Sequence, residues 1–73
     1  MHIGKRIKEV LFEKGYSANW LSEQIPCERT NVYNIFRRSD MSIGLLTTIS
    51  KILGHNFFLE LADDYEQNEQ VHP

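Results

Sequence analysis

The segment 17–38, SANWLSEQIPCERTNVYNIFRR, most constrains the fold, because it predicts two short helices separated by a proline. Ser17 has a hydroxyl suited to cap the first helix. Leu21 and Ile25 lie four residues apart and therefore share one face of that helix. Pro26 ends the helix, because it has no backbone N–H and restricts the residue before it.

The second helix of this segment is predicted over residues 28–37 and has two chemically different faces. Glu28 is expected to cap it. Apolar residues spaced i, i+3 and i+4 predict its buried face: Val32, Ile35 and Phe36. The other face carries side chains that form hydrogen bonds, stack or neutralise phosphate: Arg29, Thr30, Tyr33, Asn34 and Arg37. A helix with two such faces suits the major groove of DNA.

Three further helices are predicted from periodicity and capping residues. Apolar spacing predicts a helix over residues 3–14, and Gly15 follows it as a C-terminal glycine. Ser42 is expected to cap a helix over residues 43–53 and Asn56 a helix over residues 57–64. No alternating strand pattern is present. The sequence therefore predicts an all-α fold, a compact bundle of about five short helices.

The chain of 73 residues is expected to form one domain over residues 1–65, followed by a disordered acidic tail over residues 66–73. The formal net charge is −2, but it is unevenly distributed. All eight Lys and Arg residues lie in residues 1–59 with five acids, whereas residues 60–73 carry five acids and no Lys or Arg. A mildly basic body is compatible with phosphate binding, although it is weak support for it.

Catalysis and metal binding are not expected. The three histidines are dispersed, without a partner at metal-ligand spacing, and His55 is expected to serve the turn before the last helix. The single cysteine, Cys27, is expected to act as a small buried hydrophobe. No Gly-rich phosphate loop or membrane-length apolar run is present, and the N-terminus does not resemble a signal peptide. We therefore expect no enzyme activity, no cofactor and no membrane association.

Four motifs, IGKRIKEVLFEKGYS, WLSEQI, ERTNVYNIF and LLTTISKILG, follow one another in a recognisable order. In order and spacing they resemble the lambda-repressor-like (Xre/Cro-repressor type) helix-turn-helix domains over about residues 3–61. The resemblance implies a helix-turn-helix at residues 17–37. It also implies a transcriptional regulator that binds double-stranded operator DNA, usually as a homodimer, in a cytoplasmic protein of bacterial or phage origin.

The sequence departs from the family pattern at three places. Pro26 stands where the family usually has a turn glycine. Ala18 replaces a glutamine that often touches DNA, so one contact is expected to be absent. Leu11 and Phe36 stand where many members have an arginine–glutamate pair. A well-packed apolar pair is often as stabilising as a buried ion pair, so Leu11 is expected to contact Phe36.

The resemblance also implies which side chains contact DNA. The positions that match base-contacting residues are Arg29, Thr30, Tyr33 and Asn34. Arg29 suits a guanine edge and Asn34 an adenine edge. Phosphate contacts are expected from five residues: Ser17, Asn19, Asn31, Arg37 and Arg38. An ordinary solvated helix face is the alternative for each of these side chains.

Two rival functions remain open. The first is a protein–protein interaction module that keeps the fold and binds a partner through Phe12, Trp20, Tyr33 or Phe58. The second is an antitoxin that binds both DNA and protein. Phe12 and Trp20 also have ordinary interpretations, as a half-exposed edge residue and as a cover of the core. If the chain is a homodimer, Phe57, Phe58 and the last predicted helix are the expected interface.

Overall fold

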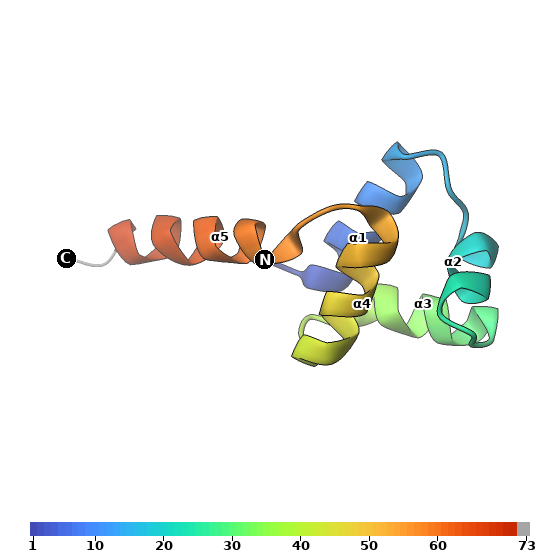
Figure 1. Cartoon of the computed structure of the whole chain (residues 1–73). Coiled ribbons are helices and arrows are strands. Elements are labelled where there is room, and N and C mark those ends of the chain that lie inside the picture. Colours follow the sequence, from blue (N-terminus) through green and yellow to red (C-terminus); the bar gives the residue numbers. More distant parts are fainter. Residues whose placement is uncertain (72–73) are drawn as a thin grey trace.

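The computed structural model describes residues 1–71 of the chain, with side chains described up to residue 67, and that part is all-helical, without strands. The helices are α1 (Ile3–Glu13), α2 (Ala18–Gln24), α3 (Arg29–Arg37), α4 (Ile43–Leu53) and α5 (Phe57–Val71). The predicted all-α class with five helices is therefore confirmed. Helices α1 to α4 gather into one body, and α5 extends away from it (Figure 1).

Three predicted helix caps are present. Ser17 Oγ accepts a hydrogen bond from the Trp20 N–H at 3.1 Å, and Ser42 Oγ accepts one from the Leu45 N–H at 3.2 Å. Asn56 Oδ1 accepts from the N–H groups of both Phe58 and Leu59, at 3.0 and 3.3 Å. These short polar side chains satisfy donors that have no partner inside a helix.

Glu28 stands at the start of α3, as predicted, and caps the helix through its main chain alone. Glu28 occupies the N-cap position of α3, but its carboxylate forms no capping hydrogen bond. Its backbone oxygen accepts from the Asn31 N–H at 2.9 Å, so only the main chain of Glu28 closes the first turn. The side chains that favour N-cap positions are the shorter ones of Ser, Thr, Asp and Asn.

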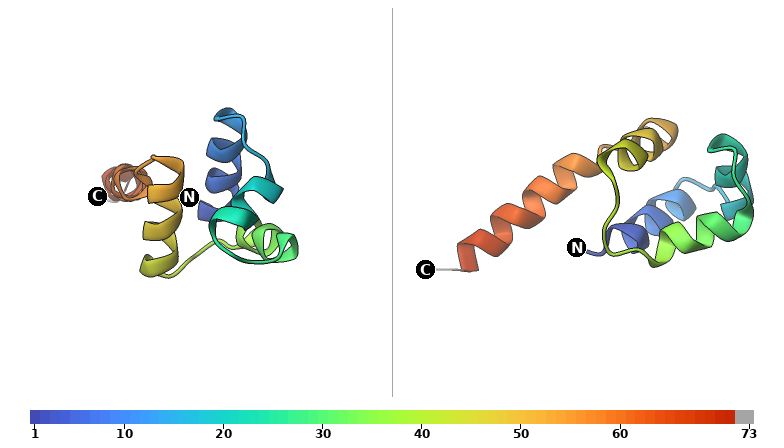
Figure 2. Two further views of the ribbon diagram at one scale, coloured as in Figure 1. Left: turned by 45° about the vertical axis from the view of Figure 1, so that its right-hand side comes forward. Right: turned by 90° about the horizontal axis from the view of Figure 1, so that it is seen from below.

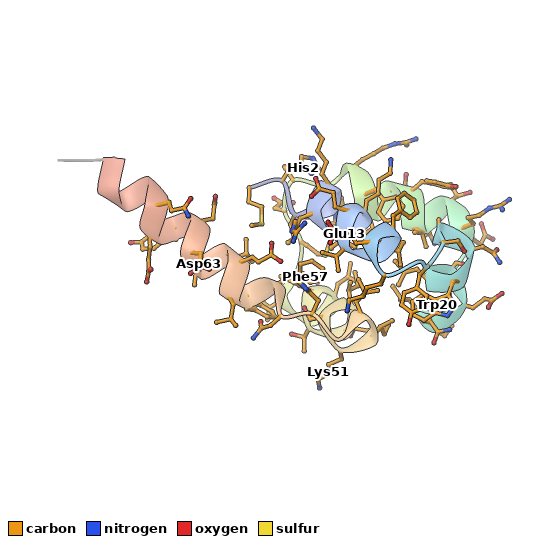
Figure 3. The ribbon with its side chains drawn as sticks, turned by 90° about the horizontal axis from the view of Figure 1, so that it is seen from above. His2, Glu13, Trp20, Lys51, Phe57 and Asp63 are labelled. Carbon is orange, nitrogen blue, oxygen red and sulfur yellow. The ribbon has the colours of Figure 1, made fainter. Side chains whose placement is uncertain are left out.

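The core draws on every helix. Its buried apolar side chains are Ile3, Ile7, Val10, Leu11, Ala18, Leu21, Val32, Ile35, Phe36, Leu46, Ile49, Leu53 and Phe57. Trp20 and Cys27 are partly buried against this cluster, Trp20 as a cover of the core. Phe57 has no exposed surface, so its predicted place in a dimer interface is wrong. The side chain lies between α5 and the body of the protein (Figure 3).

Helices α1 and α3 touch backbone to backbone at Gly4. The Gly4 N–H donates to the Arg38 carbonyl oxygen at 2.9 Å. A Cβ at this position would lie 2.4 Å from the Ile35 carbonyl oxygen and 2.6 Å from those of Phe36 and Arg38. The start of α1 therefore rests directly on the last turn of α3 and fixes the position of α3 relative to the core.

Helix α5 continues to Val71, whereas the sequence predicted its end at residue 64 and disorder from residue 66. That prediction is wrong for residues 66–71, and residues 72 and 73 lie outside the described part. Glu and Gln are good helix formers, and no Gly or Pro interrupts the chain before Pro73. A helix already nucleated by packed residues extends at little cost through such a sequence.

A charged network connects α1 to α5. Arg6 Nε donates to Glu60 Oε1 at 2.6 Å, and Arg6 Nη1 lies 3.0 Å from Glu9 Oε2 and 3.8 Å from Glu13 Oε1. His55, in the turn between α4 and α5 as predicted, binds the second oxygen of Glu60. Burial opposes the charge of Glu60, but hydrogen bonds from Arg6 and His55 outweigh it and lower its pKa. Hydrogen bonds to Glu60 and Glu9 raise the pKa of Arg6.

Glu60→Gln is expected to lower the free energy of unfolding by about 1 kcal/mol at pH 7, because it removes the charge that holds Arg6. Because the pKa of Glu60 is lowered in the folded state, its carboxylate stabilises the fold fully at pH values above the ordinary pKa of 4.5. This stabilisation is lost as the pH falls through the lowered pKa. The difference in free energy of unfolding between wild type and Glu60→Gln should therefore become smaller as the pH is lowered. Urea unfolding at pH 7, 5, 4 and 3 measures it.

Asp63→Asn is the matched control, because Asp63 is an exposed acid on the same helix. It should change stability by less than about 0.5 kcal/mol at every pH. A gap for Glu60→Gln that stays constant from pH 7 to pH 3 would contradict the ionic role of Glu60.

Candidate nucleic-acid interface

The short connection between α2 and α3 is tied back to α2 by a backbone hydrogen bond. Cys27 N–H donates to the Ser22 carbonyl oxygen at 3.1 Å, and the Ser22 hydroxyl donates to the Asn19 carbonyl oxygen at 2.6 Å. Cys27 is half-buried rather than fully buried. Pro26 lies in this turn and is exposed. Helix α3 then packs against both α2 and α1.

Helix α3 is anchored by one face and presents the other to solvent. Its buried residues are Val32, Ile35 and Phe36, as predicted. The four candidate base-contacting side chains are exposed and share the opposite side and flanks: Arg29, Thr30, Tyr33 and Asn34. No helix covers them, and α3 lies along the edge of the body (Figure 2). The position of these residues is compatible with entry into a groove.

Aromatic rings support the orientation of Tyr33. Its ring meets that of Phe36 edge-on, with centroids 5.9 Å apart and planes at 82°. Phe36 in turn meets Phe12 of α1 edge-on at 6.4 Å. Edge-to-face pairs are favourable beyond the area they bury. Tyr33 therefore packs against the buried ring of Phe36, while 46% of the surface of Tyr33 is exposed.

The candidate phosphate-contacting side chains are all exposed, but they fall into two groups. Asn31, Arg37 and Arg38 lie on α3 or directly after it. Arg37 Nη1 lies 3.5 Å from Asn34 Oδ1, a long contact that a base or phosphate would displace at little cost. Ser17 and Asn19 lie at the start of α2, where Ser17 already caps the helix.

Asn19 is the weakest of these candidates. Its Nδ2 donates to Glu23 Oε1 at 3.4 Å, which places a carboxylate beside any incoming phosphate. Ala18 is buried and belongs to the core rather than to the surface. Leu11 and Phe36 share the core, as their replacement of an ion pair predicts, but their direct contact stays a prediction.

Side chains of α1 also lie in this region, which the sequence did not predict. Lys5 and Lys8 border α3 and, together with His2, line a hollow whose other wall contains Tyr33, Phe36 and Arg37. The missed signal is their spacing of three residues, which places both lysines on one side of α1.

Other kinds of site are not found in the part of the chain that the structure describes. Among the side chains that the structure describes, residues 1–67, no three or more of His, Cys, Asp and Glu are placed to hold a metal ion. Among the same residues, no helix combines the length and the apolar character that crossing a membrane requires.

No protein-family model, curated protein or solved structure matches the chain. The resemblance to lambda-repressor-like domains therefore rests on the residue motifs alone.

Proposed function

We propose that this protein binds double-stranded DNA in a sequence-specific manner and inserts α3 into the major groove as a helix-turn-helix recognition helix. One observation carries the proposal: Val32, Ile35 and Phe36 are buried, while Arg29, Thr30, Tyr33 and Asn34 are all exposed on the same helix. Each of these four side chains is ordinary on a solvated helix face, and the support comes from their occurrence together beside an anchored face. Transcriptional regulation is the biological role that fits this activity.

The chemistry of the face suits base edges. Arg29 has a planar guanidinium that can donate two hydrogen bonds to guanine O6 and N7. Asn34 can form two hydrogen bonds with adenine N6 and N7 once its long contact with Arg37 opens. The methyl group of Thr30 can pack on a thymine methyl. Helix α3 has nine residues and is therefore about 13 Å long, a size that the major groove admits.

Such a short helix reads only a few base pairs, so specific binding calls for a homodimer on a two-part site. With Phe57 buried in the core, the exposed apolar residues of α5 are the remaining candidates for this interface. They are Phe58, Leu59 and Tyr65, with 38, 64 and 65% of their surface exposed. Helix α5 extends beyond the body, which leaves its far half accessible to a second copy (Figure 1).

A second candidate function, a protein-binding module, is favoured by a separate group of aromatic residues. Tyr16 and Trp20 stack with centroids 3.8 Å apart and nearly parallel planes, and Phe12 has 49% of its surface exposed. Aromatic side chains at a surface are typical of protein interfaces. The two functions differ in salt dependence, since DNA binding weakens steeply with salt and aromatic contacts do not.

Arg29→Ala is expected to relax the sequence preference at one base pair, because it removes a two-bond contact worth about 1–3 kcal/mol. Selection of binding sites from a random duplex pool, followed by titration of the best sites, measures this as roughly a ten- to hundredfold loss of discrimination. A wild-type protein that enriches no sequence and binds no duplex at low salt would refute the DNA-binding function and favour the protein-binding module.

Arg38→Ala is the matched control, because it removes the same charge from a position after α3 where a phosphate contact is expected. It should weaken binding to all sequences alike and leave the preference unchanged. An unchanged preference for Arg29→Ala would show that Arg29 does not read a base.

A further inference from the structure

A hollow of about 450 Å³ lies between the first half of α1 and the last half of α3. Four of its six lining residues carry or can carry positive charge, and the other two are aromatic: His2, Lys5, Lys8, Arg37, Tyr33 and Phe36. No carboxylate lines it. Tyr33 and Arg37 also belong to the exposed part of α3, so the hollow is continuous with the proposed DNA-binding face.

The lysines of α1 and its acidic residues lie on different sides of the helix. Lys5, Lys8 and Phe12 are spaced i, i+3 and i+7, which places them on one side of the helix. The ring of Phe12 meets Phe36, so this side faces α3, and Lys8 Nζ lies 5.9 Å from the centre of the Phe12 ring. Arg6, Glu9 and Glu13 have the same spacing one position further along, so they lie on the adjacent side of α1, about 100° round the helix.

Lys5 and Lys8 have no acidic partner among the described residues. Arg6 forms ion pairs with Glu9 and Glu13 of its own helix and with Glu60 of α5. Within the described residues, no ion pair involves Lys5, Lys8 or Arg37. The positive charge of the hollow is therefore not neutralised by the protein itself, and it favours an anionic partner.

We propose that this hollow binds phosphate groups of the DNA backbone that flanks the groove occupied by α3, with Lys5 and Lys8 as the contacting cations. The inference rests on the proposed DNA-binding function and extends its contacts from α2 and α3 to α1. Tyr33 and Arg37 belong both to the hollow and to the exposed part of α3. A DNA strand that leaves the groove next to them therefore passes beside α1. These contacts position the protein and carry no base preference.

The test compares two double variants with the same change of charge. Lys5→Gln/Lys8→Gln removes the cations of the hollow, and Lys14→Gln/Lys51→Gln removes two exposed lysines outside it. Lys51 projects from the side of the molecule opposite His2 (Figure 3). Affinity for the selected duplex is measured between low and moderate salt for both variants and for wild type, with thermal melting to confirm that each is folded.

The hollow variant should bind about tenfold more weakly, and its slope of log affinity against log salt should be shallower by about 2, as expected for two lost phosphate contacts. Its sequence preference should match that of wild type. The control should keep the wild-type slope within about 0.5.

Equal slopes for the two double variants, with wild type bound normally, would overturn the role of the hollow and leave the DNA-binding function standing. A wild-type protein that binds no duplex at low salt would overturn both. A hollow variant with an altered base preference would also refute the inference, because it would show that the lysines read bases rather than phosphates.

Discussion

Gly4→Ala is expected to lower the free energy of unfolding by about 3 kcal/mol and the melting temperature by roughly 10–20 °C. The new methyl group would lie 2.4 Å from the Ile35 carbonyl oxygen and 2.6 Å from two others. These are backbone atoms at the end of a helix, so they cannot turn away as a flexible side chain would. Either α1 moves off α3, and loses the hydrogen bond from Gly4 to Arg38, or the end of α3 unwinds.

The structure offers a matched control for this change in Gly44→Ala. Gly44 also lies inside a helix, its φ is not positive, and a Cβ there would meet nothing within 4 Å. Alanine should therefore stabilise α4 by up to about 1 kcal/mol through helix propensity. Thermal melting monitored by circular dichroism compares the two. Equal melting temperatures for the two variants would show that the close contact of α1 and α3 is not part of the fold.

Local signals in the sequence predicted most of the helices well. Ser17, Ser42 and Asn56 each precede a helix and cap it, because short polar side chains reach the free N–H groups of the next turn. Gly54 ends α4 in the left-handed conformation that favours glycine. These features depend on residues within four positions of one another, so a sequence alone contains them.

The predictions from the sequence fail where the structure depends on contacts between residues that are distant in the chain. The sequence predicts Phe57 at a dimer interface, because its spacing does not reveal that it is buried in the core of its own chain. The contact of Gly4 with the end of α3 joins residues more than 30 positions apart, and no local pattern shows it. Helix α5 passes residue 64 because nothing in the sequence stops it, although the residues beyond have little to bury.

The candidate site shows the same division. The period of Val32, Ile35 and Phe36 was enough to predict which face of α3 is exposed. The sequence did not show that Lys5 and Lys8 border that face, because this depends on how α1 packs across α3. It also did not show which lysines and arginines of α1 are neutralised, since Glu60, the distant partner of Arg6, lies on another helix.

Phe57→Ala and Phe58→Ala are expected to separate folding from association, because two adjacent phenylalanines have opposite environments. Phe57 has no exposed surface, so its truncation should cost about 3–5 kcal/mol, most of the stability of a domain of this size. Phe58 has 38% of its surface exposed, and its truncation should cost less than about 1 kcal/mol. Urea unfolding of both variants gives these values. Phe57→Leu, which keeps the apolar character, should lose much less and remain folded if the alanine variant does not.

The same pair tests where a homodimer would form. If α5 carries the interface through its exposed apolar residues, Phe58→Ala should raise the dimer dissociation constant by tenfold or more while the monomer stays folded, since buried aromatic anchors dominate interfaces. Sedimentation across a range of concentrations measures this. Phe57→Leu should leave the dissociation constant unchanged, because Phe57 faces the core of its own chain. A dimer that responds to Phe57→Leu and not to Phe58→Ala would place the interface elsewhere and would mean that Phe57 leaves the core on association.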